Sequence, residues 1–597
     1  MRLTVEHLLY WTALLLAAAM RLFALGAMPL YPHEAHNAWL AWLVATGQSV
    51  EQSGAPSSAL YHLLQSFIFL PGFTSDAVAR LAPAVAGIAL VALPWWWRSW
   101  LGRGAALVLA FLLAIDPWMV AFSRMADGTM LSIFFALLTL TAILYDPMDE
   151  AIRLRWQAIG AISAGLLLAS GAMAWSFLPL LAVALFLIEP ERRAALLNRQ
   201  NALWLAGALL VVGSGLFLNP QLLGTVSRSL SLWLTQLTGS SADSGAGYPL
   251  GWWLVRLFAE QPFNLFWGAI GVFVVIRRIR ADVEQVDASA QKWLLLFWLV
   301  WGVVLGVLPG RSPLALPMVG LPLLVLAALA VDWLWSRRTE DFDWIEGRMF
   351  LGLLIVLLIS GLFYTLKAIS NVAFDATALQ PIGLMVGLAM LLSLLYAVWL
   401  DSRQATVIVG SVVGSALLAA TLTACWHLNY RDDSITPSGL YSTATHRDVR
   451  LLAKNVATIS AQRFGDPASM PVLVELNSEM QPDPVLGWYL HESQVRWVAG
   501  ATTGEGIQPT PLLISTQANS SQNAIASTYM GSSYRLYFHW LPTDLNVAED
   551  GLSAEGLSWQ ERIGAAWNNG WRARLRWLLY RESKLLLPVD EVTLWAP

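Results

Sequence analysis

Hydrophobic stretches close to the length of a membrane-spanning helix recur along this chain from Leu8 to about Trp426, and none follows. A helix needs roughly 20 apolar residues to cross the hydrocarbon core of a bilayer. Backbone groups exposed to lipid must satisfy one another, so each span is predicted to be helical. We expect about thirteen spans, at residues 8–28, 79–97, 104–121, 128–145, 157–173, 174–190, 202–219, 252–276, 293–309, 313–335, 349–368, 379–400 and 405–426.

The composition divides the chain into two parts. Hydrophobic residues make up 57% of it and charged residues only 13%, whereas soluble domains carry roughly a quarter charged residues. Residues 1–428 are expected to form a transmembrane domain, and residues 429–597, with 13 basic and 17 acidic residues, a water-soluble domain. The predicted fold class is therefore an α-helical polytopic membrane protein with a small extracytoplasmic C-terminal α/β domain.

The C-terminal part has the pattern of a mixed domain. Apolar residues at helical spacing predict a helix over Arg447–Gln462. Short β-rich runs predict strands at Val472–Leu476, Val495–Val498, Leu512–Ser515 and Arg535–Trp540. Near the end, Trp559–Arg581 is rich in Trp and Arg and is typical of an amphipathic helix on a membrane surface.

The distribution of basic residues predicts the orientation in a cell membrane. Cytoplasmic loops are enriched in Lys and Arg, and placing the N-terminus in the cytoplasm puts 16 of the 23 basic residues before Asn429 on that side. An odd number of spans then places the C-terminal domain outside. The first outer loop, about residues 29–78, contains no Lys or Arg before Asp76. Its apolar segment Ala59–Pro71 is too short to span and predicts a re-entrant or interfacial helix.

Several function classes are disfavoured by the sequence. No basic stripe or nucleic-acid-binding motif is present, so a nucleic-acid partner is not expected. Cys425 is the only cysteine, which excludes intramolecular disulfides and cysteine-rich metal sites. A secondary transporter would favour internal repeats and charged residues in mid-span, and the sequence has no internal repeat and few such charges.

The first candidate cluster, Pro32–His36, follows the first span directly. A carboxylate such as Glu34 beside apolar surface could act as a general base on an acceptor hydroxyl. Alternatively, Glu34 only starts a helix, close to the positive end of the helix dipole. A metal site built from His33, Glu34, His36 and His62 is a further alternative, although the spacing lacks the paired histidines of a zincin helix.

Two further clusters are expected on the same outer side. In Phe122–Asp127, Arg124 could clamp an anionic lipid head group while Asp127 orients it; alternatively the two residues form a local pair that ends a helix. In Pro309–Pro313 the hydrophobic run is broken, and Arg311 is a candidate phosphate ligand. The alternative there is a tight turn whose arginine reaches to the interface.

At these residues the chain resembles the membrane-embedded glycosyltransferases of the C superfamily. The similarity is to the protein O-mannosyltransferase and aminoarabinose-transferase-like group, and within it to a prokaryotic branch named for an association with flippase activity. It covers nearly the whole chain. The matching motifs are Ser75–Ala84, Ser123-Arg124, Arg311–Leu314 and Asp483–Leu490, the last containing Trp-Tyr-Leu.

One difference from the family lies at its catalytic position. The family has an Asp-Glu pair after the first span, with the Asp assigned as base, and this chain has His33 followed by Glu34. Histidine can itself be a base near neutral pH; Glu34 could substitute, or transferase activity has been lost. Asp127 does not fall at the family spacing after Ser-Arg.

The resemblance implies transfer of a sugar from a polyprenyl-phosphate-linked donor to an acceptor at the extracytoplasmic face. Glu34 or His33 would act as base, and Ser123, Arg124, Asp127, Arg311 and Arg80 would bind substrate, with Arg80 equally suited to anchor the first outer loop. No metal or other cofactor is implied. The partners are the donor lipid, the bilayer and an unidentified acceptor. The alternative is a catalytically silent homologue that binds a lipid-linked saccharide and assists its translocation or the assembly of cell-envelope glycans.

Overall fold

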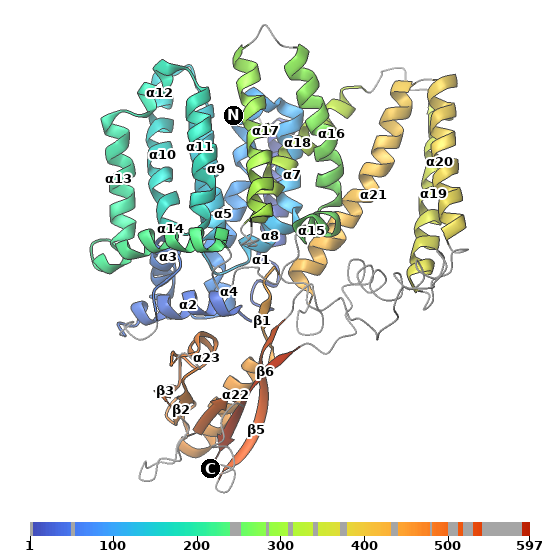
Figure 1. Cartoon of the computed structure of the whole chain (residues 1–597). Helices are drawn as coiled ribbons and strands as arrows, with labels where there is room; N and C mark the ends of the chain where they lie inside the picture. The colour runs from blue at the N-terminus through green and yellow to red at the C-terminus, as the bar shows by residue number, and fades with distance from the viewer. Residues whose placement is uncertain are drawn as a thin grey trace, which may run out of the picture.

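The protein consists of a helical part and a smaller domain built on a β-sheet, which packs against one end of the helices (Figure 1). The computed structural model describes residues 4–48, 54–238, 252–281, 286–308, 315–337, 344–370, 379–400, 402–431, 440–477, 480–499, 512–516, 529–539 and 588–596. We call the part from residue 440 onward the sheet domain, and the end of the helices that it contacts the domain side.

The helical part contains both long and short helices. In chain order they are α1 (Val5–Leu22), α2 (Pro32–Ala45), α3 (Ala59–Phe69), α4 (Asp76–Ala79), α5 (Leu81–Leu90), η1 (Leu93–Trp95), α6 (Arg98–Leu101), α7 (Arg103–Ile115), α8 (Pro117–Ser123), α9 (Thr129–Leu144), α10 (Glu150–Ala169), α11 (Met173–Leu187), α12 (Pro190–Leu196), α13 (Arg199–Gly213), η2 (Pro220–Leu222), α14 (Leu223–Thr238), α15 (Trp252–Glu260), α16 (Pro262–Ala281), α17 (Val286–Val307), α18 (Ala315–Trp335), α19 (Trp344–Ser370), α20 (Leu379–Trp399) and α21 (Ser402–Tyr430).

This architecture confirms the predicted class of a polytopic, multi-pass membrane protein. Within the described residues, eight helices are long and apolar enough to cross a bilayer, or up to ten if each of two bent pairs forms one span. The other three of the thirteen predicted segments coincide with α9, α10 and α11. Two of these are short, at 16 and 15 residues, and α10 carries charged residues in its first two turns. By length and composition the described helices therefore give eight to ten candidate spans, and a helix lies at each of the thirteen predicted positions.

Two predicted spans are broken at proline. The segment expected at 104–121 bends by 57° between α7 and α8, where Asp116 caps α8 by accepting hydrogen bonds from the N–H groups of Trp118 and Met119. The segment expected at 252–276 is two helices, α15 and α16, separated at Gln261. In both places proline takes the first helical position, where its missing N–H costs nothing, and it prevents the preceding helix from continuing.

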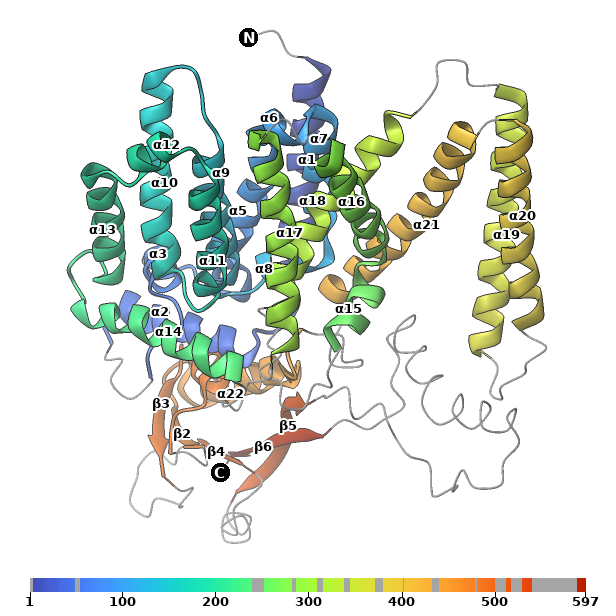
Figure 2. The ribbon, with the colours of Figure 1, turned by 45° about the horizontal axis from the view of Figure 1, so that its top comes forward.

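Short helices line the domain side. Both α2 and α14 run across the ends of the long helices in Figure 2. Two hydrogen bonds hold α14 against α11: the indole of Trp175 donates to Ser229, and that of Trp233 donates to Ser176, each at 2.9 Å. The short helix predicted at 59–71 is present as α3.

The α19–α20 hairpin packs apart from the rest of the bundle. Its buried residues form their own hydrophobic cluster with the first half of α21. An apolar cavity of about 980 Å³ lies between this hairpin, α16, α18 and α21. None of the candidate site residues lines it.

The described residues of the sheet domain form a mixed six-stranded sheet and two helices. Its elements are β1 (Thr443–Thr445), α22 (Asp448–Phe464), β2 (Pro471–Glu475), α23 (Pro484–Tyr489), β3 (Gln494–Val498), β4 (Leu512–Thr516), β5 (Met530–His539) and β6 (Val589–Ala596). The strand order is β1-β5-β6-β4-β2-β3, in which β2 pairs in parallel with β3 and β4 while the other pairs are antiparallel. The predicted helix and four strands are found, whereas β1 and β6 were not predicted. The predicted helix at 559–581 lies outside the described residues.

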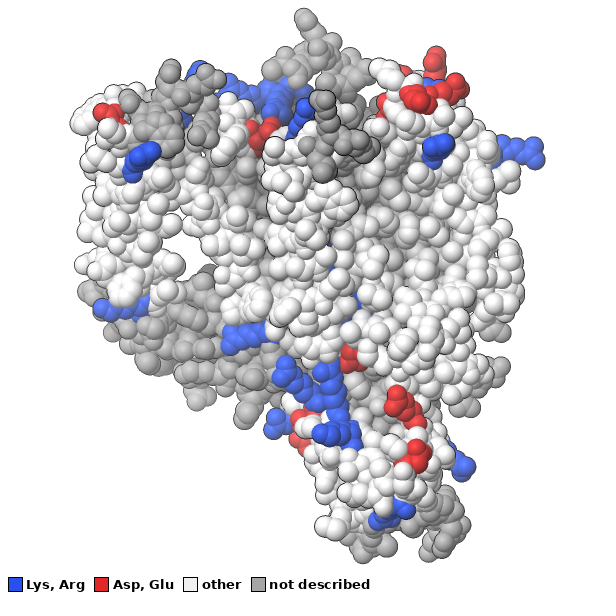
Figure 3. All heavy atoms as spheres, turned by 180° about the vertical axis from the view of Figure 1, so that it is seen from behind, with Lys and Arg blue, Asp and Glu red and all other residues white. Residues whose placement is uncertain are grey.

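The sheet domain shares its core with the helices. One hydrophobic cluster includes Trp39 of α2 and Trp488 of α23. Gly487 lets α2 and α23 pack closely, because a Cβ there would lie 2.7 Å from the indole of Trp39. On the face seen in Figure 3, basic side chains gather at the junction of the two parts, and the band of helices above them carries few charges. That pattern suits a bundle embedded in lipid.

Candidate active site

The start of α2 brings His33 and Glu34 to the domain side. Pro32 occupies the first helical position, and Glu34, in the first turn, accepts a 2.9 Å hydrogen bond from the N–H of Tyr31. A carboxylate that reaches back to the preceding turn is a common way to begin a helix. The local sequence therefore fixes where both side chains leave the backbone.

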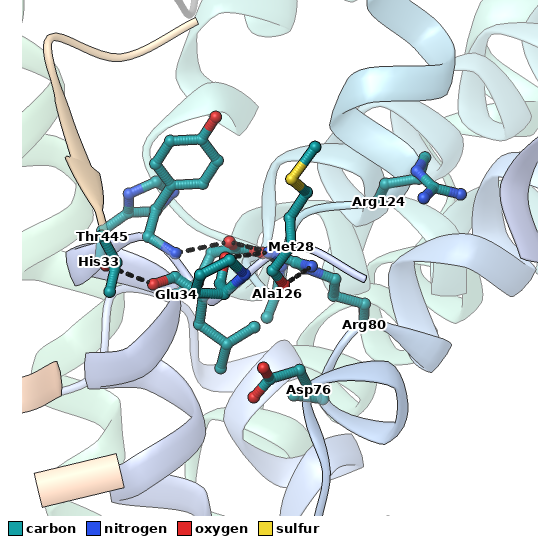
Figure 4. A network of polar contacts seen from close by, with 12 residues as sticks. Met28, His33, Glu34, Asp76, Arg80, Arg124, Ala126 and Thr445 are labelled. Atoms are coloured by element: carbon teal, nitrogen blue, oxygen red, sulfur yellow. Dashed lines mark hydrogen bonds and ion pairs between the residues drawn. The ribbon is translucent and has the colours of Figure 1, made fainter. Parts of the chain in front are cut away.

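Glu34 is completely buried and fully hydrogen-bonded (Figure 4). Its carboxylate accepts two hydrogen bonds from Arg80, at 2.9 and 2.6 Å, and one from the N–H of Ala126 at 2.6 Å, besides that from Tyr31. Burial by itself would raise the pKa of Glu34, but the charge and hydrogen bonds of Arg80 outweigh it and hold the pKa below its ordinary value. Glu34 is therefore a buried anion whose acceptor positions are in use.

Arg80, at the junction of α4 and α5, also holds the chain between α1 and α2. Its guanidinium donates to the carbonyls of Leu25, Met28 and Pro29 at 2.9 to 3.1 Å. The side chain is 4% exposed. This arrangement suits an anchor of the first loop, one of the two roles expected for Arg80.

His33 faces a second carboxylate, Asp127. Its Nε2 lies 3.8 Å from Asp127 Oδ2, and the two side chains are 32% and 8% exposed. This is ion-pair distance rather than hydrogen-bond distance. Among the described residues Nε2 has no hydrogen-bond partner.

Asp127 is oriented toward His33 by its own neighbour in the chain. Its two oxygens accept hydrogen bonds from the N–H and the hydroxyl of Thr129, at 2.9 and 3.1 Å. Burial raises the pKa of Asp127 to about 6, against the opposing effect of His33. A carboxylate titrating there beside a histidine is suited to proton transfer near neutral pH.

Two aromatic rings lie beside His33. The ring centroid of Tyr441, from the segment leading into β1, lies 4.3 Å from that of His33, and Tyr31 lies 6.0 Å away. The carbonyl of Leu440 accepts a hydrogen bond from Arg256 of α15. The first residues of the sheet domain thus form part of the wall beside His33.

Ser123 and Arg124 lie next to this group. Arg124 donates through Nη1 to the carbonyls of Arg21 and Phe23 and through Nη2 to Ala24. Among the described residues its Nε has no acceptor, so the Nε–H and one Nη2–H are not used in these hydrogen bonds. Ser123 accepts a hydrogen bond from the buried Arg21, and Gly87 makes room for them, because a Cβ there would lie 2.1 Å from Ser123 Oγ.

A buried polar network behind the site was not expected from the sequence. Glu260 accepts hydrogen bonds from Arg256 at 2.9 and 3.1 Å and from the indole of Trp118 at 2.5 Å. Beside it, Asn264 donates to Asp116 at 3.0 Å. The i,i+4 spacing of Arg256 and Glu260 was a visible signal for their pairing, but the hydrophobic window around them was read as one span.

The structure does not support the metal alternative. Across the described part of the chain, no group of three or more His, Cys, Asp or Glu side chains could hold a metal ion. His36 has a partner in the carbonyl of Ala55 at 3.3 Å. Burial lowers the pKa of His62 to about 4. Arg311 lies outside the described residues.

Comparison with known proteins identifies the fold. No family model matches the chain, and no curated protein matches it. Among solved structures it is similar to ArnT from Cupriavidus metallidurans bound to undecaprenyl phosphate, with a TM-score of 0.51 and 15% identity over 89% of this chain and 97% of ArnT. An Archaeoglobus fulgidus oligosaccharyltransferase tethered to an acceptor peptide matches with a TM-score of 0.43 and 12% identity over 82% of this chain and 63% of its own, and we draw nothing from this weaker match. The chain therefore shares the fold of this ArnT structure.

Proposed function

We propose that the protein transfers a sugar from a polyprenyl-phosphate-linked donor to an acceptor on the domain side of the membrane, which is the extracytoplasmic side in the predicted topology. The fold shared with ArnT, which was solved with undecaprenyl phosphate, supports this class of donor. The observation that carries the proposal is the pairing of a partly exposed His33 with the carboxylate of Asp127.

In this mechanism His33 is the base and Asp127 its partner. In the tautomer with a proton on Nε2, facing Asp127, the lone pair of Nδ1 accepts the proton of the acceptor hydroxyl. The acceptor oxygen then bonds to the anomeric carbon of the sugar, and the bond from that carbon to the phosphate oxygen breaks. Asp127 stabilises the imidazolium that forms, as a carboxylate does for a catalytic histidine.

Arginines stabilise the charge that develops on the leaving polyprenyl phosphate. Arg124 has N–H groups available beside the carbonyls that it binds, and Arg311 is the second candidate, from its sequence position. Fixed cations aimed at a developing charge lower the barrier directly, and the loss of one donor costs about a hundredfold or more in rate. No metal is needed for this step.

Glu34 and Arg80 serve as a positioning pair in this proposal. A general base needs a free lone pair within reach of the proton that it takes, and the carboxylate of Glu34 is enclosed by four hydrogen bonds. The histidine is therefore the better candidate, although it replaces the Asp of the family motif.

The test compares His33→Ala with His539→Ala in membranes supplied with a labelled polyprenyl-phosphate sugar. His539 is a matched control, because it too pairs with an aspartate, Asp590 at 2.8 Å, but on strand β5 of the sheet domain. His33→Ala is expected to lower the rate of transfer by about 10²- to 10⁴-fold, and His539→Ala to leave it unchanged. Equal rates in the two variants would rule out His33 as the base.

The replacement of the motif Asp by His33 favours a second candidate function, a silent homologue that binds a lipid-linked saccharide. The variant His33→Asp separates the two. A silent homologue that descends from an enzyme is expected to show no transfer as wild type and a large gain with Asp at 33. An active wild type excludes it.

A further inference from the structure

The chain between α1 and α2, residues 23–31, is held by side chains along its whole length; we call it the connector. Eight consecutive backbone carbonyls accept hydrogen bonds from side chains. Arg124 binds Phe23 and Ala24, Arg80 binds Leu25, Met28 and Pro29, Arg450 binds Gly26 and Ala27, and Thr445 binds Leu30. These carbonyls lie in irregular backbone, so no helix or sheet supplies their hydrogen-bond donors.

The donors come from both parts of the molecule. Arg80 and Arg124 belong to the helical part, whereas Thr445 and Arg450 belong to the sheet domain. Ala24 has a φ of 49°, in the left-handed region that a residue with a Cβ disfavours. The connector therefore takes its conformation from the side chains around it rather than from its own preferences.

Asp76, the first residue of α4, ties the sheet domain to this arrangement. It accepts hydrogen bonds from Arg450 at 2.6 Å and from Trp488 and Tyr489 at 2.8 Å. The hydroxyl of Tyr489 also accepts the N–H of Leu30 at 2.9 Å. The Trp-Tyr-Leu motif and the Ser75–Ala84 motif, far apart in the sequence, thus meet at one carboxylate.

We propose that the sheet domain positions His33 through the connector, with Tyr489, Arg450 and Asp76 as positioning residues. The connector ends at Tyr31, two residues before His33, so its path sets the start of α2. A displacement of about 1 Å at a reacting group can cost a hundredfold in rate, even when the change is made elsewhere. The link to catalysis rests on the proposed function, whereas the coupling of domain to connector does not.

The test variant is Tyr489→Phe, which removes one hydroxyl and with it the contacts to Asp76 and Leu30. Tyr534→Phe is the matched control, because that hydroxyl accepts a hydrogen bond from Asn455 within the sheet domain. In the full-length protein we expect faster hydrogen exchange in peptides covering residues 24–31 of Tyr489→Phe alone, since the Leu30 N–H loses its acceptor. We also expect its kcat to fall by about ten- to a hundredfold, with little change in the KM for donor.

Arg450→Lys is a second variant that guards against general misfolding. It keeps the charge beside Asp76 but cannot bridge two carbonyls as a guanidinium does, and an intermediate increase in connector exchange is expected. Connector exchange unchanged from wild type in both variants would overturn the proposal, as would faster exchange with an unaltered kcat. If the wild type shows no transfer at all, the proposed function fails while the exchange measurement still decides the coupling.

Discussion

His33 and Glu34 are neighbours in the chain, yet their surroundings are opposite. Successive residues on a helix point about 100° apart, so one side chain of the pair enters the protein while the other faces its rim. Glu34 is buried against Arg80, and His33 is 32% exposed beside Asp127. The sequence identified both residues as candidates but not which of them is buried. That depends on their partners, and Arg80 lies 46 residues and Asp127 more than 90 residues further along the chain.

The raised pKa of Asp127 predicts how transfer depends on pH. Because burial raises the pKa to about 6, the carboxylate that the proposed mechanism assigns to stabilising the charged histidine is present above that pH and is lost below it. The initial rate at saturating donor should fall as the pH drops through about 6. The Asp127→Asn variant should transfer slowly at every pH in the range, and its rate should not fall at the same pH as that of the wild type. If the rate of both proteins fell at the same pH and to the same extent, Asp127 would not be the partner of His33.

The same shift separates loss of activity from loss of fold. A carboxyl group whose folded pKa lies above its ordinary value of 3.8 binds its proton more tightly in the folded state. Its contribution to stability is therefore greatest at low pH and declines as the pH rises through 6. Acidification across this range should stop transfer, whereas protonation of Asp127 should not unfold the protein. Circular dichroism at each pH checks that the fold is retained.

At the level of helices and strands, hydrophobic periodicity found a helix at the position of every predicted span, together with the helix and four strands predicted for the sheet domain. It missed the bends at Pro117 and Pro262, because an averaging window does not register a break between two apolar segments. The Asp-Pro and Gln-Pro pairs were the available signals. It also missed α2 and α14, which are too short or too polar to span, and β1 and β6, which gain their strand character by pairing with β5.

The α15 helix carries a buried ion pair whose loss should be costly. Glu260→Gln removes the negative charge that faces Arg256 in a site where Glu260 and Arg256 are 0% and 3% exposed. Breaking a buried pair from one side costs about 3–5 kcal/mol. We expect a clearly lower melting temperature for purified Glu260→Gln in detergent.

Glu150→Gln provides the comparison for that variant. Glu150 pairs with Arg153 at 4.0 Å on the exposed start of α10, where solvent screens the charges. Its melting temperature should match that of the wild type. If Glu260→Gln had the same melting temperature as Glu150→Gln, the network behind the site would contribute nothing to stability.

For the whole molecule, the sequence indicated two parts of different solubility, but not how they join. The residues that join them were partly identified: Arg80 and the Trp-Tyr-Leu motif stood out, whereas Asp76 was noted only as part of a motif. The partner of Asp76 could not be predicted, because Arg450 lies more than 370 residues further along the chain. No local sequence pattern encodes a contact over that separation. Arg450 and Thr445 gave no signal, because each is an ordinary polar residue at its position.

The orientation in the membrane is open to a direct test. Cys425 is buried, so single cysteines placed at exposed Ala194 of α12 and Ser533 of β5 should dominate labelling. In intact cells or right-side-out vesicles, a membrane-impermeant maleimide is expected to label Ser533→Cys directly and Ala194→Cys only after permeabilisation. The reverse pattern would invert the predicted topology and place the transfer site in the cytoplasm.

The connector also sets an order of assembly. It is among the first segments that the ribosome makes, yet the threonine that binds the carbonyl of Leu30 is made 415 residues later and the tyrosine that binds its N–H 459 residues later. During synthesis part of the connector backbone, just before α2, stays without these partners until Thr445 and Tyr489 have been made. A chain that stops before Tyr489 therefore never completes the connector, and the ordering of this early loop depends on a domain that is made much later.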